Sequence, residues 1–407
     1  MSVRMNVANP LSLRRTGGWE IGNLSPVLWT MSNKGITIGD QGTIAANLVA
    51  WVNDGAVPVA AGSDFTLTAS AGNVVHRIAT GGATMTRGPS EVTVEGVAGT
   101  AGWISIGLGA NSLAWFDLAT GVVGTGGGTA YLAHTITALG AGRYRCVLQA
   151  TFTAGDTARI GIGTADNTPV WNAAGTETIT VRAVPSFGLG GASIIIQRCV
   201  SQWADVRSNG NLWAQVTSGI QPIYWIDAKG PCLVFQPFGW LQADSLAAAR
   251  NGTNIPFWFA AAVDSMTGTT ARSLYSFGCT LHARDHRLDV PESAIIAADA
   301  WRYNDAGTGK DVPKVTAAPL AEGAIVSSFD GTTGSLHYGS AALVTANSAI
   351  AGGATTDRLT LGALRRNAGA IQLFQGRVRE VAIHPTSYLS AADITLAHDS
   401  LTNKWGY

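Results

Sequence analysis

The sequence predicts an all-β protein made of two antiparallel β-sandwich (jelly-roll) domains in tandem, with one short helix at the C-terminus. Alternation of apolar and polar residues with a period of two recurs along the chain, whereas helical periodicity is almost confined to its end. Glycine accounts for 50 of the 407 residues, which suits the many tight turns of such folds. The 46% hydrophobic content, with 13 Trp, supplies a packed interior and argues against disorder.

The clearest alternating segments identify individual strands. They are residues 65–68, 92–94, 104–106, 159–162 and 178–181. Each segment is short and is bounded by turn residues, which is typical of antiparallel sandwiches.

One helix is predicted at residues 390–405. Ser390 can cap its first free N–H groups, and Asp393 lies in the first turn, where the helix dipole favours an acidic group. Its apolar positions fall on one face: Ile394, Ala397, Leu401 and Trp405. We expect this helix to cover one face or end of a sandwich.

A glycine-rich stretch that begins at Gly188 marks the main domain boundary. The predicted organisation is an N-terminal arm or docking segment (1–32), a jelly roll (33–187), a linker (188–199) and a second sandwich (200–407). Residues 1–32 could equally form an edge strand and a loop of the first sandwich.

The charge balance excludes several functional classes. Lys and Arg number 26 and Asp and Glu number 26, so the formal net charge is zero. This removes the basic surface that binds nucleic acid or anionic membranes. No apolar run is long enough for membrane insertion, and no secretion signal follows the N-terminal arginines. The chain is therefore expected to fold in the cytoplasm.

The acidic residues offer no catalytic pair. Glu91 and Glu95 share one face of a strand, because four residues is an even step. The signature of sandwich-fold glucanases would require acidic residues at positions occupied by Thr93 and Gly96. We interpret the pair as part of a solvated strand face, and the sequence predicts that the protein is not an enzyme.

Cysteine usage argues against a disulfide scaffold or a zinc site. The four cysteines are Cys146, Cys199, Cys232 and Cys279, and they show no CxxC spacing. They are interpreted as buried thiols, with a structural disulfide as the alternative. No catalytic residue, metal ligand or cofactor is predicted.

The stretch around residues 103–152 carries the most specific local pattern. An Ala-Trp-Phe-Asp-Leu-Ala-Thr-Gly segment at 114–121 is followed by Ile-Thr-Ala-Leu-Gly-Ala-Gly-Arg-Tyr-Arg-Cys at 136–146. This succession resembles a carbohydrate-binding-module-like jelly roll common in virion proteins of tailed bacteriophages. The resemblance covers about residues 45–187.

The second half carries a different pattern. Residues 324–331, the Phe-Gln-Gly-Arg-Val-Arg-Glu strand that begins at Phe374 and the Leu389-Ser390 helix start resemble a concanavalin A-like/laminin G-like sandwich over about 200–407. Tyr338 and Gly339 replace the Val/Ile-Asn-Gly turn of that family. A calcium ion, which the resemblance would allow, therefore finds no support.

Together the two resemblances imply a structural virion component, such as a head spike or tail fibre of a bacteriophage or gene transfer agent. Such a protein would assemble in the bacterial cytoplasm, contact capsid or tail proteins, form a homo-oligomer and bind host surface polysaccharide to aid attachment. The alternatives are a purely architectural decoration or connector and, third, a polysaccharide depolymerase.

Two clusters pair aromatic rings with polar groups near turn residues and are candidate carbohydrate-binding sites. The candidates are Asn167 and Trp171, and Trp301, Tyr303, Asn304 and Asp305. The alternative for each Trp is packing in the core.

Overall fold

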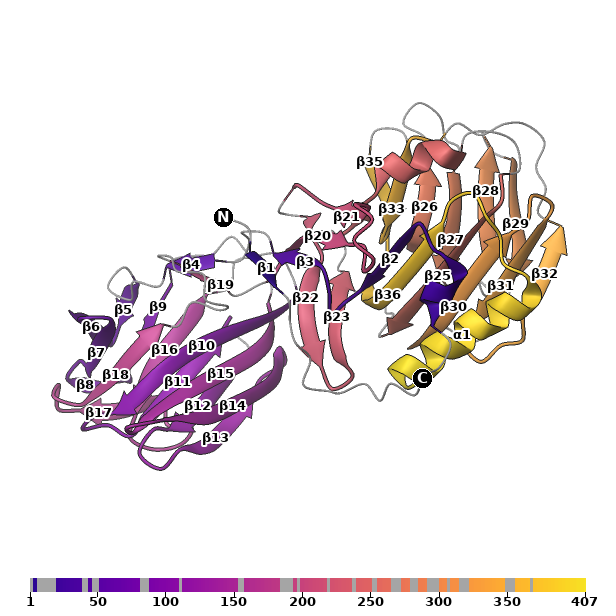
Figure 1. The fold of residues 1–407 in the computed structure, drawn as a ribbon. Helices are drawn as coiled ribbons and strands as arrows, with labels where there is room; N and C mark the ends of the chain where they lie inside the picture. The colour runs from indigo at the N-terminus through magenta and orange to yellow at the C-terminus, as the bar shows by residue number, and fades with distance from the viewer. Residues whose placement is uncertain are drawn as a thin grey trace. The chain divides into compact units, whose positions relative to one another are not determined.

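The computed structural model describes residues 3–5, 20–38, 43–45, 51–80, 88–109, 112–152, 157–183, 193–195, 198–217, 220–235, 239–250, 255–264, 272–278, 285–290, 300–305, 308–314, 322–347, 356–366 and 369–407. The chain divides into two compact units. We call Asp40–Arg198 the central sandwich, and Met1–Gly39 together with Cys199–Tyr407 the C-terminal sandwich. The predicted all-β fold class is confirmed: the described residues form antiparallel strands with one α-helix, at the C-terminus (Figure 1).

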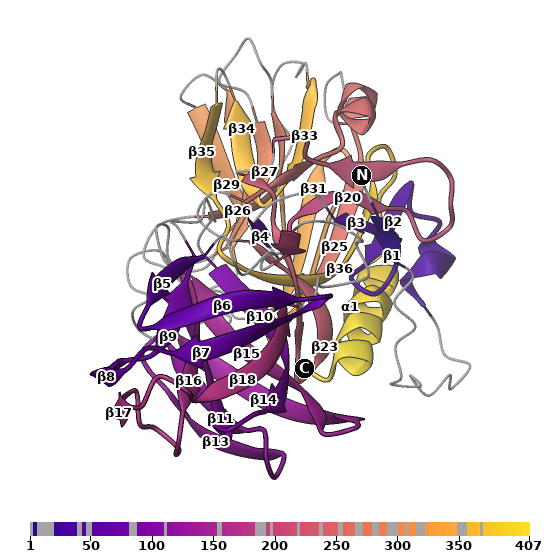
Figure 2. The same ribbon diagram turned by 90° about the vertical axis from the view of Figure 1, so that its left-hand side faces the viewer.

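The central sandwich consists of two six-stranded sheets. The first contains, in spatial order, β14 (Tyr131–Gly140), β15 (Arg143–Phe152), β10 (Gly88–Ala98), β18 (Thr178–Ala183), β7 (Asp64–Ala69) and β6 (Ala56–Ala61). The second contains β13 (Val122–Gly127), β12 (Leu113–Asp117), β11 (Trp103–Leu108), β16 (Ala158–Gly163), β9 (Arg77–Ala79) and β5 (Val52–Asp54) (Figure 2). Two ribbons complete it, β8 (Gly72–Val75) with β17 (Val170–Ala173), and β4 (Thr43–Ala45) with β19 (Ser193–Ile195).

Strand alternation fixes which face of the second sheet is buried. Ile104 and Ile106 of β11, with Ile160 and Ile162 of β16, are at most 1% exposed and belong to the core between the sheets. Because successive side chains point to opposite faces, the residues between them lie on the face turned away from this core. That outer face carries the pocket described below.

The motif that carries the first resemblance has a physical role in the turn after β12. Asp117 accepts hydrogen bonds from the backbone N–H groups of Ala119 (2.8 Å) and Thr120 (3.2 Å), which closes the turn after β12. Gly121 follows with φ +74°, and a Cβ there would lie 2.3 Å from the ring of Tyr144. Only glycine therefore fits between this turn and the strand that presents Tyr144.

The C-terminal sandwich contains a ten-stranded and an eight-stranded sheet. The larger one is ordered β1 (Val3–Met5), β3 (Ile36–Ile38), β20 (Val200–Ala204), β21 (Leu212–Ala214), β24 (Leu241–Gln242), β33 (Arg358–Leu361), β26 (Arg272–Gly278), β27 (Asp285–Val290), β28 (Ala300–Asp305) and β29 (Thr308–Lys314). The smaller one is ordered β22 (Ile223–Asp227), β23 (Gly230–Phe235), β36 (Gly376–His384), β25 (Phe257–Asp264), β30 (Glu322–Phe329), β31 (Thr333–Tyr338) and β32 (Val344–Asn347), with β2 (Leu28–Met31) also paired to β36. β34 (Ala363–Arg366) and β35 (Gly369–Leu373) form a separate ribbon. Trp203 and Phe277 from one sheet and Phe259 from the other belong to one buried core.

Helix α1 (Ala391–Trp405) covers the outer face of the smaller sheet, as the sequence predicted (Figure 1). Ser390 Oγ accepts a hydrogen bond from Asp393 N at 3.2 Å and so caps the helix. The apolar face packs against strand residues that alternate away from the main core, namely Trp258, Ala260, Ala262, Ala324, Val326 and Ala382. Among the described residues no helix is long and apolar enough to cross a membrane.

The N-terminal segment is integrated into the C-terminal sandwich rather than forming an arm. β2 pairs with β36 (Trp29 opposite Ala382), and β3 pairs with β20 (Trp203 opposite Ile36). The structure therefore differs from the expected boundaries of 1–32 and 33–187, because these partners are distant in sequence and alternation alone does not reveal them. Within the predicted linker 188–199, β19 pairs with β4, so residues 193–195 belong to the central sandwich.

A stacked histidine pair joins α1 to β31. The rings of His337 and His398 are parallel within 10° with centroids 3.7 Å apart, and Asp399 Oδ1 lies 3.5 Å from His398 Nδ1. Burial, followed by the neighbouring His398, lowers the pKa of His337 below its usual value of 6.5. The folded state thus favours the neutral ring.

We expect the C-terminal sandwich to lose stability as the pH falls. Because the pKa of His337 is lower in the folded than in the unfolded chain, its contribution is complete above pH 6.5 and declines as the pH drops through the lowered value. Thermal unfolding of the full chain should show a lower Tm at pH 5 than at pH 7, and His337→Gln should reduce this difference by about 2–4 °C. Equal pH dependence in both proteins would contradict this prediction.

A candidate binding pocket on the central sandwich

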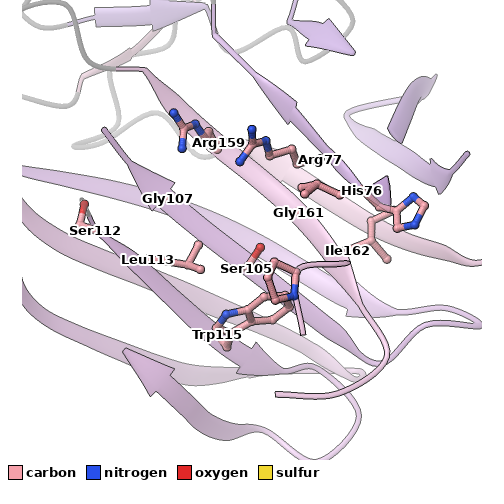
Figure 3. A pocket seen from close by; sticks show the side chains of 12 residues that line it. His76, Arg77, Ser105, Gly107, Ser112, Leu113, Trp115, Arg159, Gly161 and Ile162 are labelled. Atoms are coloured by element: carbon pink, nitrogen blue, oxygen red, sulfur yellow. The ribbon is translucent and has the colours of Figure 1, made fainter. Parts of the chain in front are cut away.

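A pocket of about 210 Å³ lies on the outer face of the second sheet of the central sandwich (Figure 3). Its floor is formed by β11 and β16, where Ser105 pairs with Gly161 and Gly107 with Arg159. Small residues occupy three of these four outward positions, so the sheet has a hollow where larger side chains would otherwise project. The volume is below the roughly 300 Å³ at which pockets for drug-sized ligands begin, and it suits a single ring-sized group.

The two glycines maintain the hollow in different ways. A Cβ on Gly161 would lie 2.4 Å from Ser105 Oγ, which is too close for any side chain without movement of the serine. A Cβ on Gly107 would meet only ordinary contacts, 3.4 Å from the Ser112 carbonyl oxygen and 3.5 Å from Arg159 Cβ. A side chain at Gly107 is therefore tolerated by the strand but would enter the pocket.

One side of the pocket is apolar. Leu113 and Trp115 project from β12, and Pro169 comes from the segment before β17. Trp115 is held firmly, because its side chain is 2% exposed and its ring packs against the space that a side chain on Gly163 would fill. Trp115 is therefore the buried, fixed base of this wall, and very little of its ring is exposed to the pocket.

Two arginines line another part of the pocket. Arg77 on β9 lies opposite Gly161, and Arg159 is two residues from Gly161 on β16, so the two are diagonal neighbours on paired strands. Arg77 Nε donates to Asp54 Oδ2 at 2.5 Å in a pair exposed to solvent. The Ser105 and Ser112 hydroxyls complete the polar groups of the floor and rim.

His76, which directly precedes β9, also lines the pocket and is 1% exposed. Its Nδ1 lies 2.9 Å from the carbonyl oxygen of Gly55 and its Nε2 lies 2.9 Å from that of Trp171. Carbonyl oxygens only accept hydrogen bonds, so both bonds can be made at once only by a ring that is protonated on both nitrogens.

The predicted residues Asn167 and Trp171 do not line this pocket, although Trp171 contacts His76, which does. Asn167 is exposed, with φ 51°, in the turn before β17. Trp171 is half-buried: its ring centroid is 4.6 Å from that of His76 and its Nε1 donates to the Ile162 carbonyl at 3.2 Å. The indole thus supports His76.

The second predicted cluster lies in the other sandwich and within a strand. Trp301, Tyr303, Asn304 and Asp305 all belong to β28. This strand pairs on both sides, with Trp301 opposite Leu288 and Asn304 opposite Gly309. The cluster therefore lies within the ten-stranded sheet, and its role in binding stays a prediction.

The other residues singled out from the sequence have structural partners. Glu91 and Glu95 do share a face of β10, but Glu91 accepts from Arg198 (3.0 Å) and Glu95, only 7% exposed, from Arg145 (2.9 Å). The face is thus ion-paired rather than simply solvated.

The prediction of buried thiols is confirmed for three cysteines, whereas Cys279 lies outside the described residues. Burial raises the pKa of Cys146 to about 12. Within the described ranges, no group of three or more His, Cys, Asp or Glu could hold a metal ion.

The sequence matches no family model and no curated protein sequence. Solved structures that resemble the fold include a Trypanosoma rangeli sialidase in complex with sialic acid, at 12% identity and a TM-score of 0.30, and mouse laminin α1 chain domains LG4-5, at 13% identity and a TM-score of 0.29. Each match covers 86% of this chain, and they cover 62% of the sialidase and 90% of the laminin fragment. The chain thus spans less than two thirds of the sialidase.

These neighbours correct one prediction. The sequence predicted that the protein is not an enzyme, and the several sialidases among the similar structures overturn that prediction. Identities of 11–12% and TM-scores of 0.30–0.32 in these structures transfer no active site and no reaction.

Sequence reasoning missed the pocket residues although the signal was present. The segments 104–108 and 159–162 alternate isoleucine with Ser105, Gly107, Arg159 and Gly161. Taken along one strand, this pattern indicates only which face is buried. The hollow becomes visible when the register places the small residues of β11 beside those of β16.

Proposed function

We propose that the protein binds carbohydrate and that the central sandwich holds a sugar residue in the pocket over β11 and β16. The observation that carries the proposal is the combination of a rigid apolar wall at Trp115 and Pro169 with hydroxyl and guanidinium groups around a ring-sized hollow. Sugars present apolar C–H faces and polar hydroxyl edges, and sites for them combine the same two kinds of surface.

We further propose, from the resemblance to phage virion proteins, that the glycan is host surface polysaccharide. The chain would then act as a spike or fibre component of a phage-like particle, assembled in the bacterial cytoplasm. Its partners would be other virion proteins and further copies of itself. No cofactor is included in this proposal.

Filling the pocket tests this function. Gly107→Val adds a side chain that the strand accommodates and that enters the hollow, so we expect retention on host polysaccharide to fall about tenfold or more with an unchanged melting curve. Gly102→Val is the matched control, because a Cβ there meets only Ala119 at 3.6 Å and Asp117 at 3.9 Å. A glycan array and capsule pull-down in which the wild-type chain and both variants behave alike would contradict the proposal.

A second candidate function is purely architectural, and exposed valines favour it. Val52 on β5 (58% exposed) and Val57 and Val59 on β6 (43% and 58%) lie on strands that end the two sheets of the central sandwich. Apolar groups on edge strands suit contact with another chain. Light scattering of the full chain, with and without host polysaccharide, distinguishes assembly from glycan binding.

A further inference from the structure

The charge of the pocket narrows the class of sugar. Arg77 and Arg159 line it, and no carboxylate is among the described residues that do so. Asp54, which pairs with Arg77, stands outside the lining and its side chain is 48% exposed. An exposed pair of this kind is weak, so Arg77 can turn part of its donor fork toward a ligand at little cost.

The arrangement of the walls matches an acidic sugar ring. A carboxylate at the arginine side would accept charge-assisted hydrogen bonds from guanidinium groups, which fit its two oxygens. The ring would then lie toward Trp115 and Pro169, and its hydroxyls would reach Ser105 Oγ on the floor.

We infer that the pocket selects sugars that carry a carboxylate, with Arg77 and Arg159 as the groups that recognise it. This inference rests on the proposed carbohydrate-binding function. It concerns the sugar class alone.

The test uses the full chain and three acidic polysaccharides: hyaluronan, alginate and colominic acid. Each is immobilised beside its carboxyl-reduced form, in which the acid is converted to a primary alcohol. We expect binding to at least one acidic form, a loss of about tenfold or more on carboxyl reduction, and a further fall as NaCl is raised from about 50 to about 500 mM.

Two variants assign the effect to the pocket. Arg159→Gln and Arg77→Gln should each weaken binding to the acidic form about tenfold without changing retention of the reduced form. Arg182→Gln is the matched control: it removes the same charge from β18 in the opposite sheet, where Arg182 pairs with Asp64 at 2.7 Å, and it should bind like the wild type. The melting curve of each variant shows that it is folded.

The outcomes separate this inference from the function on which it rests. Equal binding to the acidic and reduced forms, lost in Gly107→Val, would overturn acid selection and keep carbohydrate binding. If Arg182→Gln abolishes the preference for the acidic form as strongly as Arg159→Gln does, the assignment of carboxylate recognition to the pocket arginines would also be overturned. No binding to these glycans or to host polysaccharide would overturn both.

Discussion

Replacing Arg379 by Met is expected to lower the free energy of unfolding of the C-terminal sandwich by about 3–5 kcal/mol. Arg379 is completely buried on β36, and its Nη2 lies 2.7 Å from both Asp227 Oδ2 and Asp264 Oδ2. Its Nη1 donates to the carbonyl oxygens of Gly230 (2.9 Å) and Pro231 (3.1 Å). The variant would leave two carboxylates and two carbonyls without this donor in a poorly solvated site.

The two carboxyl groups respond differently to the same arginine. Burial raises the pKa of Asp264 and outweighs the attraction of Arg379, so the net direction is upward. Burial also acts to raise the pKa of Asp227, but its hydrogen bonds and charge interaction with Arg379 outweigh it, so that pKa is lowered. Both groups therefore depend on Arg379 to remain charged inside the protein.

Chemical denaturation of the full chain, followed for the C-terminal sandwich, checks this prediction. Arg377→Met is the control, because Arg377 is 34% exposed and contacts only Asp227 among the described carboxylates, so we expect a loss below about 1 kcal/mol. Adding Asp227→Asn and Asp264→Asn to Arg379→Met should recover part of the loss by removing the unpaired charges. Equal losses in Arg377→Met and Arg379→Met would contradict the prediction.

Trp29→Ala is expected to cost about 3–5 kcal/mol, also in the C-terminal sandwich. Trp29 is 7% exposed and packs in the core under α1. Its Nε1 donates to Glu380 Oε1 at 2.7 Å, while Glu380 Oε2 accepts from Trp405 Nε1 (2.9 Å) and Lys404 Nζ (2.7 Å). The variant removes a large buried ring and one of the three donors that satisfy a buried carboxylate.

Hydrogen exchange on the full chain locates this loss. Amide protection should fall in β36 and α1 and stay unchanged in β10 and β15 of the central sandwich. Tyr388→Ala removes an aromatic ring that is 54% exposed and should change protection little. Loss of protection confined to residues 20–38 would show that the N-terminal segment is not needed for the rest of the sandwich.

Much of the local structure could be predicted from the sequence. The alternating segments 65–68, 104–106 and 159–162 lie within β7, β11 and β16, and the helix begins one residue after its predicted cap, Ser390. These features depend on neighbours within a few residues, which a single sequence displays.

Features that depend on distant partners could not be predicted. Nothing near Trp29 in the sequence indicates that it lies opposite Ala382, so residues 20–38 were assigned to an arm or to the first domain. The pocket also depends on partners that are distant in sequence, because Gly107 and Gly161 form one hollow only through the pairing of β11 with β16. The predicted residues Asn167 and Trp171 are not among those that line it, and their role in binding stays a prediction.

The pairing of β2 with β36 also has a consequence for synthesis on the ribosome. The central sandwich is continuous in sequence and can fold as soon as it emerges, whereas Leu28–Met31 must wait until Gly376–His384 has been translated. At about 5–20 residues per second the delay is on the order of tens of seconds. During that time an apolar strand remains without its partner, so translation speed and chaperone access should govern the yield of native chain more than the stability of the finished sandwich does.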